Sequence, residues 1–186
     1  MSNPSIVAIV GSLRKGSLNL QLAQQAQALC AGKADFEILD ISRLPMMNED
    51  IEYPAPAEVA ALRSKVQQAD GVWIFTPEYN HYFSGVLKNA LDWLSRPISK
   101  TEKQVLLSKP VAISGIAPSM MGTGIAQDHL VALLTFINAR VMNSPRLRIP
   151  NANEQVVDGV LRLTQSLQFL QEQLDAFLPF IEANKK

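Results

Sequence analysis

Short apolar runs alternate with amphipathic stretches along this chain, and that alternation limits its possible folds more than any other feature. The first run, Ile6–Val10, consists entirely of apolar residues, which is typical of a strand buried on both faces. Apolar residues at helical spacing follow it, at Leu18, Leu22, Ala26 and Leu29. Buried strands joined by amphipathic helices predict an α/β fold with a parallel sheet.

The same alternation continues to the end of the chain. We expect further strands at residues 36–39, 71–76, 110–114 and 140–149, with Pro145 interrupting the last one. We expect further helices at residues 57–68, 85–95, 124–138 and 154–180, with Ser84 capping the second of these and a bend near Pro179. No linker, repeat or low-complexity tract divides the sequence, so residues 1–186 are expected to form a single domain.

Right-handed helical crossovers put helices on both faces of a parallel sheet, which gives a three-layer α/β/α sandwich. Five strands favour the flavodoxin-like order 2-1-3-4-5 over the six strands of a full dinucleotide-binding fold. In such sheets the ligand binds beyond the carboxyl ends of the strands, where the strand order reverses. The loops after the first, third and fourth strands are therefore the candidate site.

Composition excludes several classes of function. The chain has 17 basic and 17 acidic residues among 186, and this balance argues against non-specific nucleic-acid binding. Cys30 is the only cysteine, and His81 and His129 are the only histidines, so we expect neither a disulfide nor a metal site. No stretch resembles an export signal or a membrane span, and we expect a cytoplasmic protein with no membrane partner.

The loop after the first strand, Gly11–Asn19, has the composition of an anion-binding loop. It leads into a helix, whose amino terminus offers unpaired N–H groups, while Ser12, Ser17 and Asn19 add side-chain donors and Arg14 adds a charge. The spacing matches neither a Walker A loop nor the dinucleotide glycine pattern, and without those glycines we interpret Asp40 as a turn residue. A terminal phosphate suits the loop best; the alternative is that these residues only cap the helix.

The loop after the third strand reads Thr76-Pro-Glu-Tyr-Asn80. Pro77 stiffens the chain, so that the N–H groups of Glu78, Tyr79 and Asn80 could face a flat heteroaromatic ring. For Glu78 the commoner alternative is a solvated carboxylate. His81 is either a proton donor or simply exposed.

The loop after the fourth strand, Gly115–Gly124, contains glycines that allow close backbone approach to a ligand. Met120 and Met121 in this loop could pack against a ring or fill a subunit contact. Three aromatic residues near the helix at 85–95 predict either a subunit interface or part of the core: Tyr82, Phe83 and Trp93.

Together these loops resemble the NADPH-dependent FMN reductase family, specifically its chromate and quinone reductase branch. The matching residues are Gly11-Ser-Leu-Arg-Lys-Gly-Ser17 with Asn19, Thr76–Asn80, and the helix Leu87-Lys-Asn-Ala-Leu-Asp-Trp-Leu-Ser95. The likeness extends from Ile6 to about Pro145.

The resemblance implies a flavodoxin-like fold, tightly but non-covalently bound FMN, NAD(P)H as co-substrate, and a homodimer or homotetramer. The cofactor-binding residues that it implies are Ser12, Arg14, Ser17, Leu18, Asn19, Pro77, Glu78, Tyr79, Asn80 and Ala117. Relatives often carry hydroxyl residues where Ile116 and Ala117 stand, so a flavin contact there would come from the backbone. Relatives often carry an aromatic residue where His81 stands.

The implied function is reduction of quinones, free flavin, chromate or azo compounds through FMN, with no catalytic side chain and no metal. The donor and the acceptor would alternate on one face of the ring in a ping-pong mechanism. One alternative is a flavodoxin-type electron carrier without reductase activity, although such carriers are usually markedly acidic. A second alternative is a flavin-free α/β module that binds another phosphate.

Overall fold

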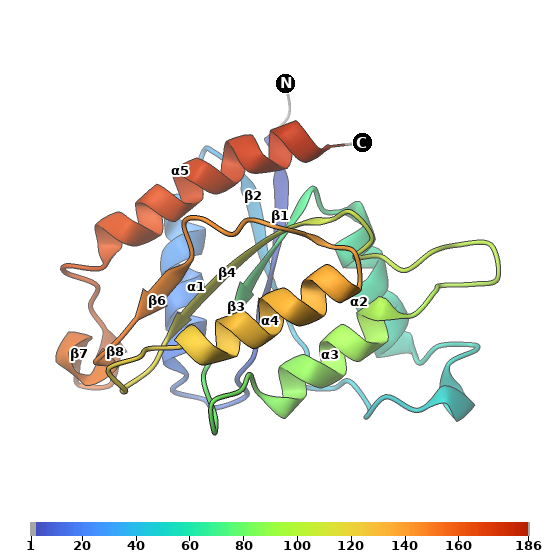
Figure 1. Ribbon diagram of the computed structural model, residues 1–186, viewed down its shortest axis with the longest axis horizontal. Coiled ribbons are helices and arrows are strands. Elements are labelled where there is room, and N and C mark those ends of the chain that lie inside the picture. Colours follow the sequence, from blue (N-terminus) through green and yellow to red (C-terminus); the bar gives the residue numbers. More distant parts are fainter. Residues whose placement is uncertain (1–2, 186) are drawn as a thin grey trace.

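The computed structural model describes residues 3–185, and its elements follow the expected alternation (Figure 1). The strands of the main sheet are β1 (Ser5–Val10), β2 (Asp35–Leu39), β3 (Gly71–Phe75), β4 (Pro110–Ile116), β5 (Arg140–Val141) and β6 (Leu147–Ile149). The helices are α1 (Leu18–Leu29), α2 (Ala57–Gln68), α3 (Gly85–Ser95), α4 (Gly124–Phe136) and α5 (Leu167–Asn184). A 3₁₀ turn, η1 (Glu49–Ile51), lies in the loop after β2.

All pairings in the main sheet are parallel, in the order β2-β1-β3-β4-β5. β5 and β6 pair with successive parts of β4, so they form the two halves of the interrupted fifth strand. The predicted order 2-1-3-4-5 is confirmed. Pro145, which lies between the two halves, explains the interruption because proline cannot donate a ladder hydrogen bond.

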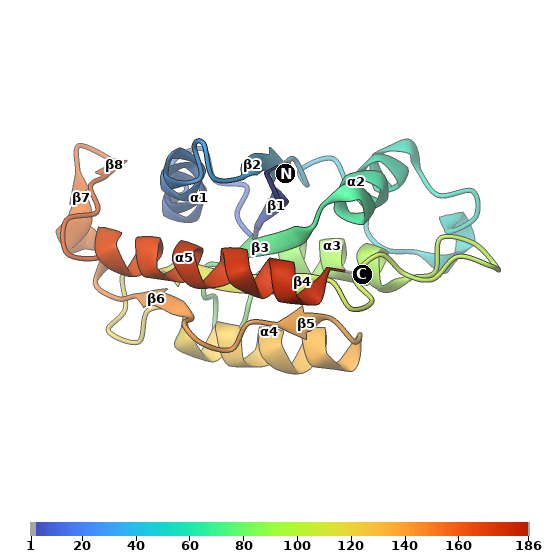
Figure 2. The ribbon, with the colours of Figure 1, turned by 90° about the horizontal axis from the view of Figure 1, so that it is seen from above.

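Two clusters of buried apolar side chains lie between the sheet and its helices, and Figure 2 shows the sheet and the helices from above. On one face, alternate strand residues such as Ile6, Ala8 and Trp73 pack against α1 and α5. On the other face, Val7, Ile9 and their neighbours pack against α2, α3 and α4. Every residue of β3 and β4 is buried, as expected for central parallel strands.

Trp73 stacks on Phe75 and meets the edge of Phe177 from α5, with ring centroids 5.4 and 5.7 Å apart. Its indole N–H donates to the Ser114 hydroxyl at 2.7 Å, so that its buried polar atom is satisfied. These contacts fix α5 over the centre of the sheet.

The prediction of one helix over residues 154–180 is wrong for its first part. Residues Ala152–Gln155 form the 3₁₀ turn η2, and β7 (Val156–Val157) and β8 (Val160–Leu161) form an antiparallel hairpin. An Asp158-Gly159 turn, with both residues at positive φ, favours a hairpin over a helix. The Gln21 side chain holds the hairpin through Gly159 O at 3.1 Å and Leu161 N at 2.7 Å. Helix α5 then continues past Pro179.

Cys30 lies buried at the end of α1. Burial raises the pKa of its thiol to about 11, because the thiolate would lose its hydration. The thiol is therefore protonated at neutral pH.

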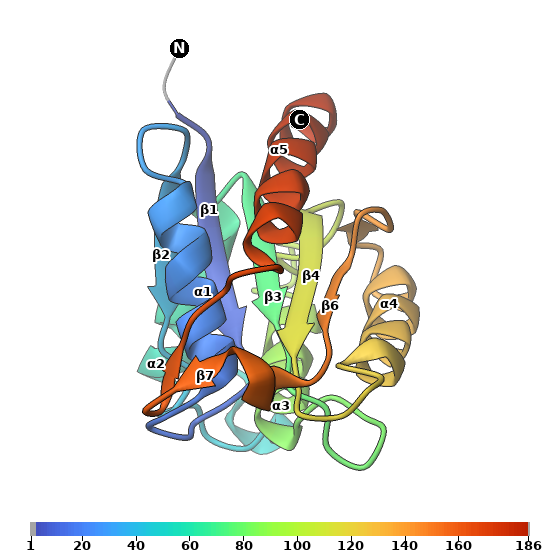
Figure 3. The same cartoon turned by 90° about the vertical axis from the view of Figure 1, so that its left-hand side faces the viewer.

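Figure 3 shows the carboxyl ends of β1, β3 and β4 pointing toward one edge, where the loops that follow them gather. The β7–β8 hairpin lies at the same edge. The fold thus brings together the loops that the sequence indicated as the candidate site.

Candidate functional site

The loop after β1 ends at Ser17, which is the N-cap of α1. The Ser17 side chain is buried, and its hydroxyl oxygen accepts from Leu20 N at 3.2 Å. Within residues 3–185 the backbone N–H groups of Leu18 and Asn19 have no protein partner, as expected in the first turn of a helix. These two N–H groups and the positive end of α1 are features that favour a bound anion.

Asn19 differs from the expectation that its side chain faces the loop. Its amide donates to Ile116 O at 3.0 Å and accepts from Ile116 N at 3.1 Å. The buried N–H and carbonyl of Ile116 need hydrogen-bond partners, and the Asn19 side chain supplies both. The side chain of Asn19 therefore ties α1 to β4, which leaves its backbone N–H for a ligand.

Arg14 is exposed and has no ion pair among the described residues. Its carbonyl oxygen accepts from Ser17 N at 3.0 Å, so its backbone belongs to the turn that precedes α1. Ser12, which lies half-buried at the start of the loop, completes the group of candidate phosphate residues. A guanidinium beside a helix amino terminus suits a phosphate dianion, because both carry positive charge toward it.

The loop after β3 is a tight hairpin. Tyr79 and Tyr82 exchange backbone hydrogen bonds of 2.8 and 2.9 Å, and Asn80 and His81 between them have φ of 51° and 60°. The expectation that the Tyr79 N–H faces a ring is wrong, because that N–H donates to Tyr82 O. The N–H groups of Glu78 and Asn80 and the exposed Tyr79 ring remain for a ligand.

Glu78 is not the solvated carboxylate of the alternative interpretation. Its side chain is only 9% exposed, and it accepts from Ala126 N at 3.0 Å, in the first turn of α4. His81 Nδ1 lies 3.6 Å from the other carboxylate oxygen. A carboxylate is favoured at a helix amino terminus, so Glu78 joins the loop after β3 to α4.

The loop after β4 begins at Ala117, whose N–H and carbonyl both have protein partners. Its N–H donates to Ile149 O at 3.1 Å, and its carbonyl accepts from Ala152 N at 3.1 Å. The Ala117 N–H is therefore taken by the last residue of β6, and a flavin contact at this residue would come from the methyl group or from the second lone pair of the carbonyl oxygen. Met120 and Met121 further along are exposed.

The three aromatic residues near α3 divide between the core and the surface. Phe83 and Trp93 are buried, so the core interpretation holds for them and they cannot form an interface. Tyr82 is exposed and lies between Phe83 and His129, with ring centroids 4.5 and 4.4 Å away.

Sequence reasoning missed the loop after β2 as part of the site. Leu44 and Met46 from this loop line a cavity of about 460 Å³ with Ser12, Tyr79 and Val86. The sequence signal that could have indicated the loop after β2 is its length, since loops this long in compact domains are usually functional.

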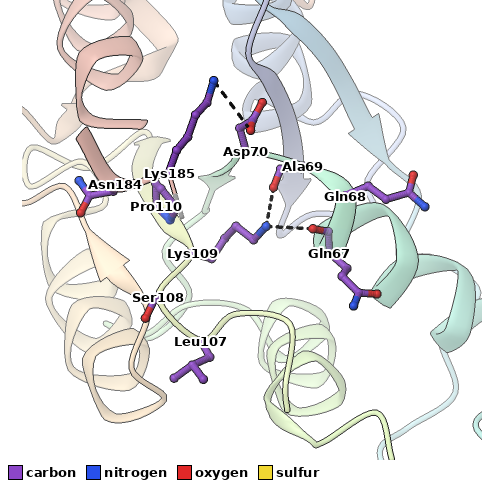
Figure 4. A pocket seen from close by; sticks show the side chains of 10 residues that line it. All are labelled: Gln67, Gln68, Ala69, Asp70, Leu107, Ser108, Lys109, Pro110, Asn184 and Lys185. Carbon is purple, nitrogen blue, oxygen red and sulfur yellow. Dashed lines mark hydrogen bonds and ion pairs between the residues drawn. The ribbon is translucent and has the colours of Figure 1, made fainter. Parts of the chain in front are cut away.

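A second depression, of about 270 Å³, lies at the opposite edge of the sheet, beside the starts of β3 and β4 (Figure 4). Lys109 Nζ donates there to the carbonyl oxygens of Ala69 and Gln67, and Lys185 Nζ lies 4.0 Å from an Asp70 oxygen. These cations already have protein partners, which indicates a structural role.

The part of the chain that the structure describes holds no group of three or more His, Cys, Asp or Glu residues placed to bind a metal. Across residues 3–185, every helix is too short or too polar to cross a lipid bilayer.

The fold is that of a flavodoxin-like α/β protein, and the loops after β1 and β3 lie together with the amino terminus of α1 at the carboxyl ends of its strands. The NADPH-dependent FMN reductase family model matches residues 4–154. The chain is 38% identical to an NAD(P)H-dependent FMN reductase of Pseudomonas aeruginosa, covering 92% of this chain and 91% of that protein. It is 35% identical to a 2-hydroxy-1,4-benzoquinone reductase of a Burkholderia species, covering 95% of each.

Among solved structures, the chain is similar to FerB, a flavoenzyme NAD(P)H:(acceptor) oxidoreductase from Paracoccus denitrificans. The TM-score is 0.86 at 34% identity, covering 97% of this chain and 98% of that one. This chain belongs to the NADPH-dependent FMN reductase family. The family uses FMN as cofactor and NAD(P)H as co-substrate. The unpartnered N–H groups of Leu18 and Asn19 and the exposed Arg14 fit the FMN phosphate.

We predict that Gly115→Ala lowers the free energy of unfolding by about 1–3 kcal/mol. The new Cβ would collide with the Thr123 side chain and the Thr76 carbonyl oxygen, where the end of β3 meets the N-cap of α4. Urea unfolding followed by circular dichroism measures the change. The matched control is Gly85→Ala, where a Cβ meets nothing within 4 Å. Equal unfolding midpoints for the two variants would contradict the prediction.

Proposed function

We propose that this protein is an FMN-dependent NAD(P)H oxidoreductase that reduces quinones and similar small acceptors. The observation that carries the proposal is the placement of an open helix amino terminus, with Arg14, at the same sheet edge as the Tyr79–Tyr82 hairpin. The names of its relatives support the acceptor class, since they include a 2-hydroxy-1,4-benzoquinone reductase and quinone reductases. Free flavin, chromate and azo compounds are further candidate acceptors.

The proposed roles follow the geometry of the loops. The phosphate would lie at the helix amino terminus, held by Leu18 and Asn19 N–H, by the Ser12 and Ser17 hydroxyls and by Arg14. The ring would lie against Pro77, with the N–H groups of Glu78 and Asn80 at its polar edge, the Tyr79 ring beside it and the Ala117 methyl group as apolar contact.

When bound, FMN accepts a hydride from NAD(P)H and passes electrons to the acceptor. The protein then needs no nucleophile of its own, and its residues bind, orient and shield. Glu78 fixes the ring-binding loop on α4 through Ala126 N, and Asn19 fixes the phosphate loop on β4. We infer that the loops leave space for one planar molecule, so the donor and the acceptor must alternate.

We also propose that the chain acts as one domain over residues 1–186 in the cytoplasm.

The electron-carrier alternative differs from the proposed function in one respect, which is that a carrier does not oxidise NAD(P)H by itself.

Arg14→Ala should raise the dissociation constant for FMN about 10- to 100-fold, because the phosphate loses a charged hydrogen-bond partner. Titration of the apoprotein with FMN, followed by flavin fluorescence, measures the constant. Lys15→Ala is the matched control, since it removes an exposed cation from the adjacent position. Equal affinity of the wild type and Arg14→Ala would show that the loop binds without this guanidinium.

Steady-state oxidation of NADPH with 1,4-naphthoquinone should give parallel double-reciprocal plots, because the donor and the acceptor share one space. Excess naphthoquinone should inhibit competitively against NADPH. Intersecting lines would instead require a ternary complex with two separate subsites. No NADPH oxidation at all by the FMN-loaded protein would favour the electron-carrier alternative.

We expect self-association to a homodimer or homotetramer, with the contact near the exposed Tyr82 and the loop before α3. Light scattering at micromolar concentration should then give about two or four times the chain mass of 20.5 kDa. A mass equal to that of one chain would refute the assembly.

A further inference from the structure

An apolar groove of about 460 Å³ borders the candidate cofactor site on the side of β2. It shares Ser12 and Tyr79 with the two cofactor loops and extends under α3. Its apolar walls are Leu13, Ile41, Leu44, Met46, Tyr79 and Val86. The volume is in the range of small-molecule sites and suits a one- or two-ring compound.

The rim of this groove consists of apolar side chains that protrude into solvent. Leu13, Met46 and Tyr79 are 51%, 75% and 53% exposed, and they come from three different loops. Apolar side chains grouped in this way around a cavity indicate a binding surface, whereas single exposed ones need no explanation.

The backbone on both sides of Met46 is held by α3. Asn89 donates to Pro45 O at 2.9 Å and accepts from Met47 N at 2.7 Å, and Trp93 Nε1 donates to Pro45 O at 2.8 Å. Asn89 and Trp93 are themselves buried, so these bonds are protected from water. The structure thus fixes the main chain at Met46 and presents its flexible thioether at the mouth of the groove.

Two of the polar side chains that line the groove, Ser84 and Asn89, already have protein partners. Its other hydroxyl groups belong to Ser12, Ser42 and Tyr79. The Ser84 hydroxyl donates to Gly11 O at 2.6 Å, and the Asn89 amide is used by the loop after β2. None of the residues that line the groove is Lys, Arg, Asp or Glu. An uncharged aromatic molecule fits these walls, whereas an anion such as chromate meets no cation.

We propose that this groove binds the aromatic ring of an uncharged electron acceptor and that Met46 determines specificity for it. The proposal rests on the proposed oxidoreductase function. Continuity with the cofactor loops argues for a small substrate, and a volume of about 460 Å³ suits a small molecule. The polarisable sulfur of methionine packs well on aromatic rings of different shapes, which suits a wall that accepts several quinones.

Binding is tested without turnover, using the FMN-loaded protein labelled with ¹³C at the methionine methyl groups. The probe is 2-naphthol, a planar compound that the enzyme cannot reduce. We expect 2-naphthol to shift the Met46 methyl signal, assigned from Met46→Leu, and to leave the Met120 signal in place. Met120 is the internal control because it is 85% exposed in the loop after β4. Equal shifts of both signals, or no shift at Met46, would overturn the proposal.

Kinetics give the second test. Met46→Ala should raise KM for 1,4-naphthoquinone about 3- to 10-fold, because the bound ring loses its contact with the thioether. The FMN dissociation constant should not change, and the rate with ferricyanide at saturating NADPH should change less than kcat/KM for naphthoquinone. Phe136→Ala, which removes an exposed apolar side chain at the end of α4, is the control variant and should leave KM for naphthoquinone unchanged. An unchanged KM for naphthoquinone in Met46→Ala would contradict the role of Met46.

Two other outcomes distinguish a failure of the groove proposal from a failure of the proposed oxidoreductase function. If the Met46 signal shifts with protein concentration in the absence of 2-naphthol, the groove is a contact between copies of this chain, and the proposal fails. If the wild-type protein oxidises NADPH with neither ferricyanide nor naphthoquinone, the proposed function fails, while the methyl shift still decides whether the groove binds an aromatic ring.

Discussion

The hydrogen bonds between the Asn19 side chain and the Ile116 peptide group join parts of the chain on which the site depends. Asn19 belongs to the first turn of α1, and Ile116 ends β4. That link adds a hydrogen-bonded contact with the sheet to the apolar packing of α1 and to the Gln21 bonds with the β7–β8 hairpin. It gives the unpartnered N–H groups of Leu18 and Asn19 a set distance from the loop after β4. Glu78 does the same between the loop after β3 and α4.

Helix α3 supports the opposite side of the site in a similar way. Its inner face supplies Leu87, Leu91 and Leu94 to the core, and its polar residues reach the loop after β2. Asn89 and Trp93 hold Pro45, while Arg96 forms two hydrogen bonds of 2.8 and 2.9 Å with the buried carboxylate of Glu52. These bonds, which include a charge-assisted pair, keep a proline-rich loop in one conformation. The sequence motif around Asn89 therefore has a scaffolding role in the structure.

Patterns that depend on neighbouring residues were readable from the sequence. The strand Ile6–Val10 and the helix at 57–68 follow from apolar periodicity, and the cap at Ser84 follows from its position before the helix. The hairpin at residues 156–161 was missed because its apolar residues fit helical spacing equally well, although its Asp158-Gly159 turn is a local hairpin signal. The bonds that hold the hairpin come from Gln21, which is distant in sequence and gave no such signal.

The distinction between local sequence signals and contacts with distant residues also applies to the candidate site. The three loops lie together at the carboxyl ends of the strands, as the topology alone predicts. Their individual hydrogen bonds were not predicted, because they depend on the conformation of each loop and on partners elsewhere in the chain. Tyr79 N–H is taken by Tyr82 O, and the Ala117 N–H is taken by the last residue of β6. Met46 was missed because the bonds that hold its neighbours Pro45 and Met47 come from Asn89 and Trp93 of α3, 42 to 48 residues away in the sequence.

The placement of Cys30 has a chemical consequence for the proposed reduction of quinones. Quinones are electrophiles, and thiolates add to them by Michael addition to give a stable thioether. The only thiol of this chain is buried, and its pKa of about 11 leaves almost no thiolate at neutral pH. The folded protein can therefore meet reactive acceptors repeatedly without being arylated at sulfur.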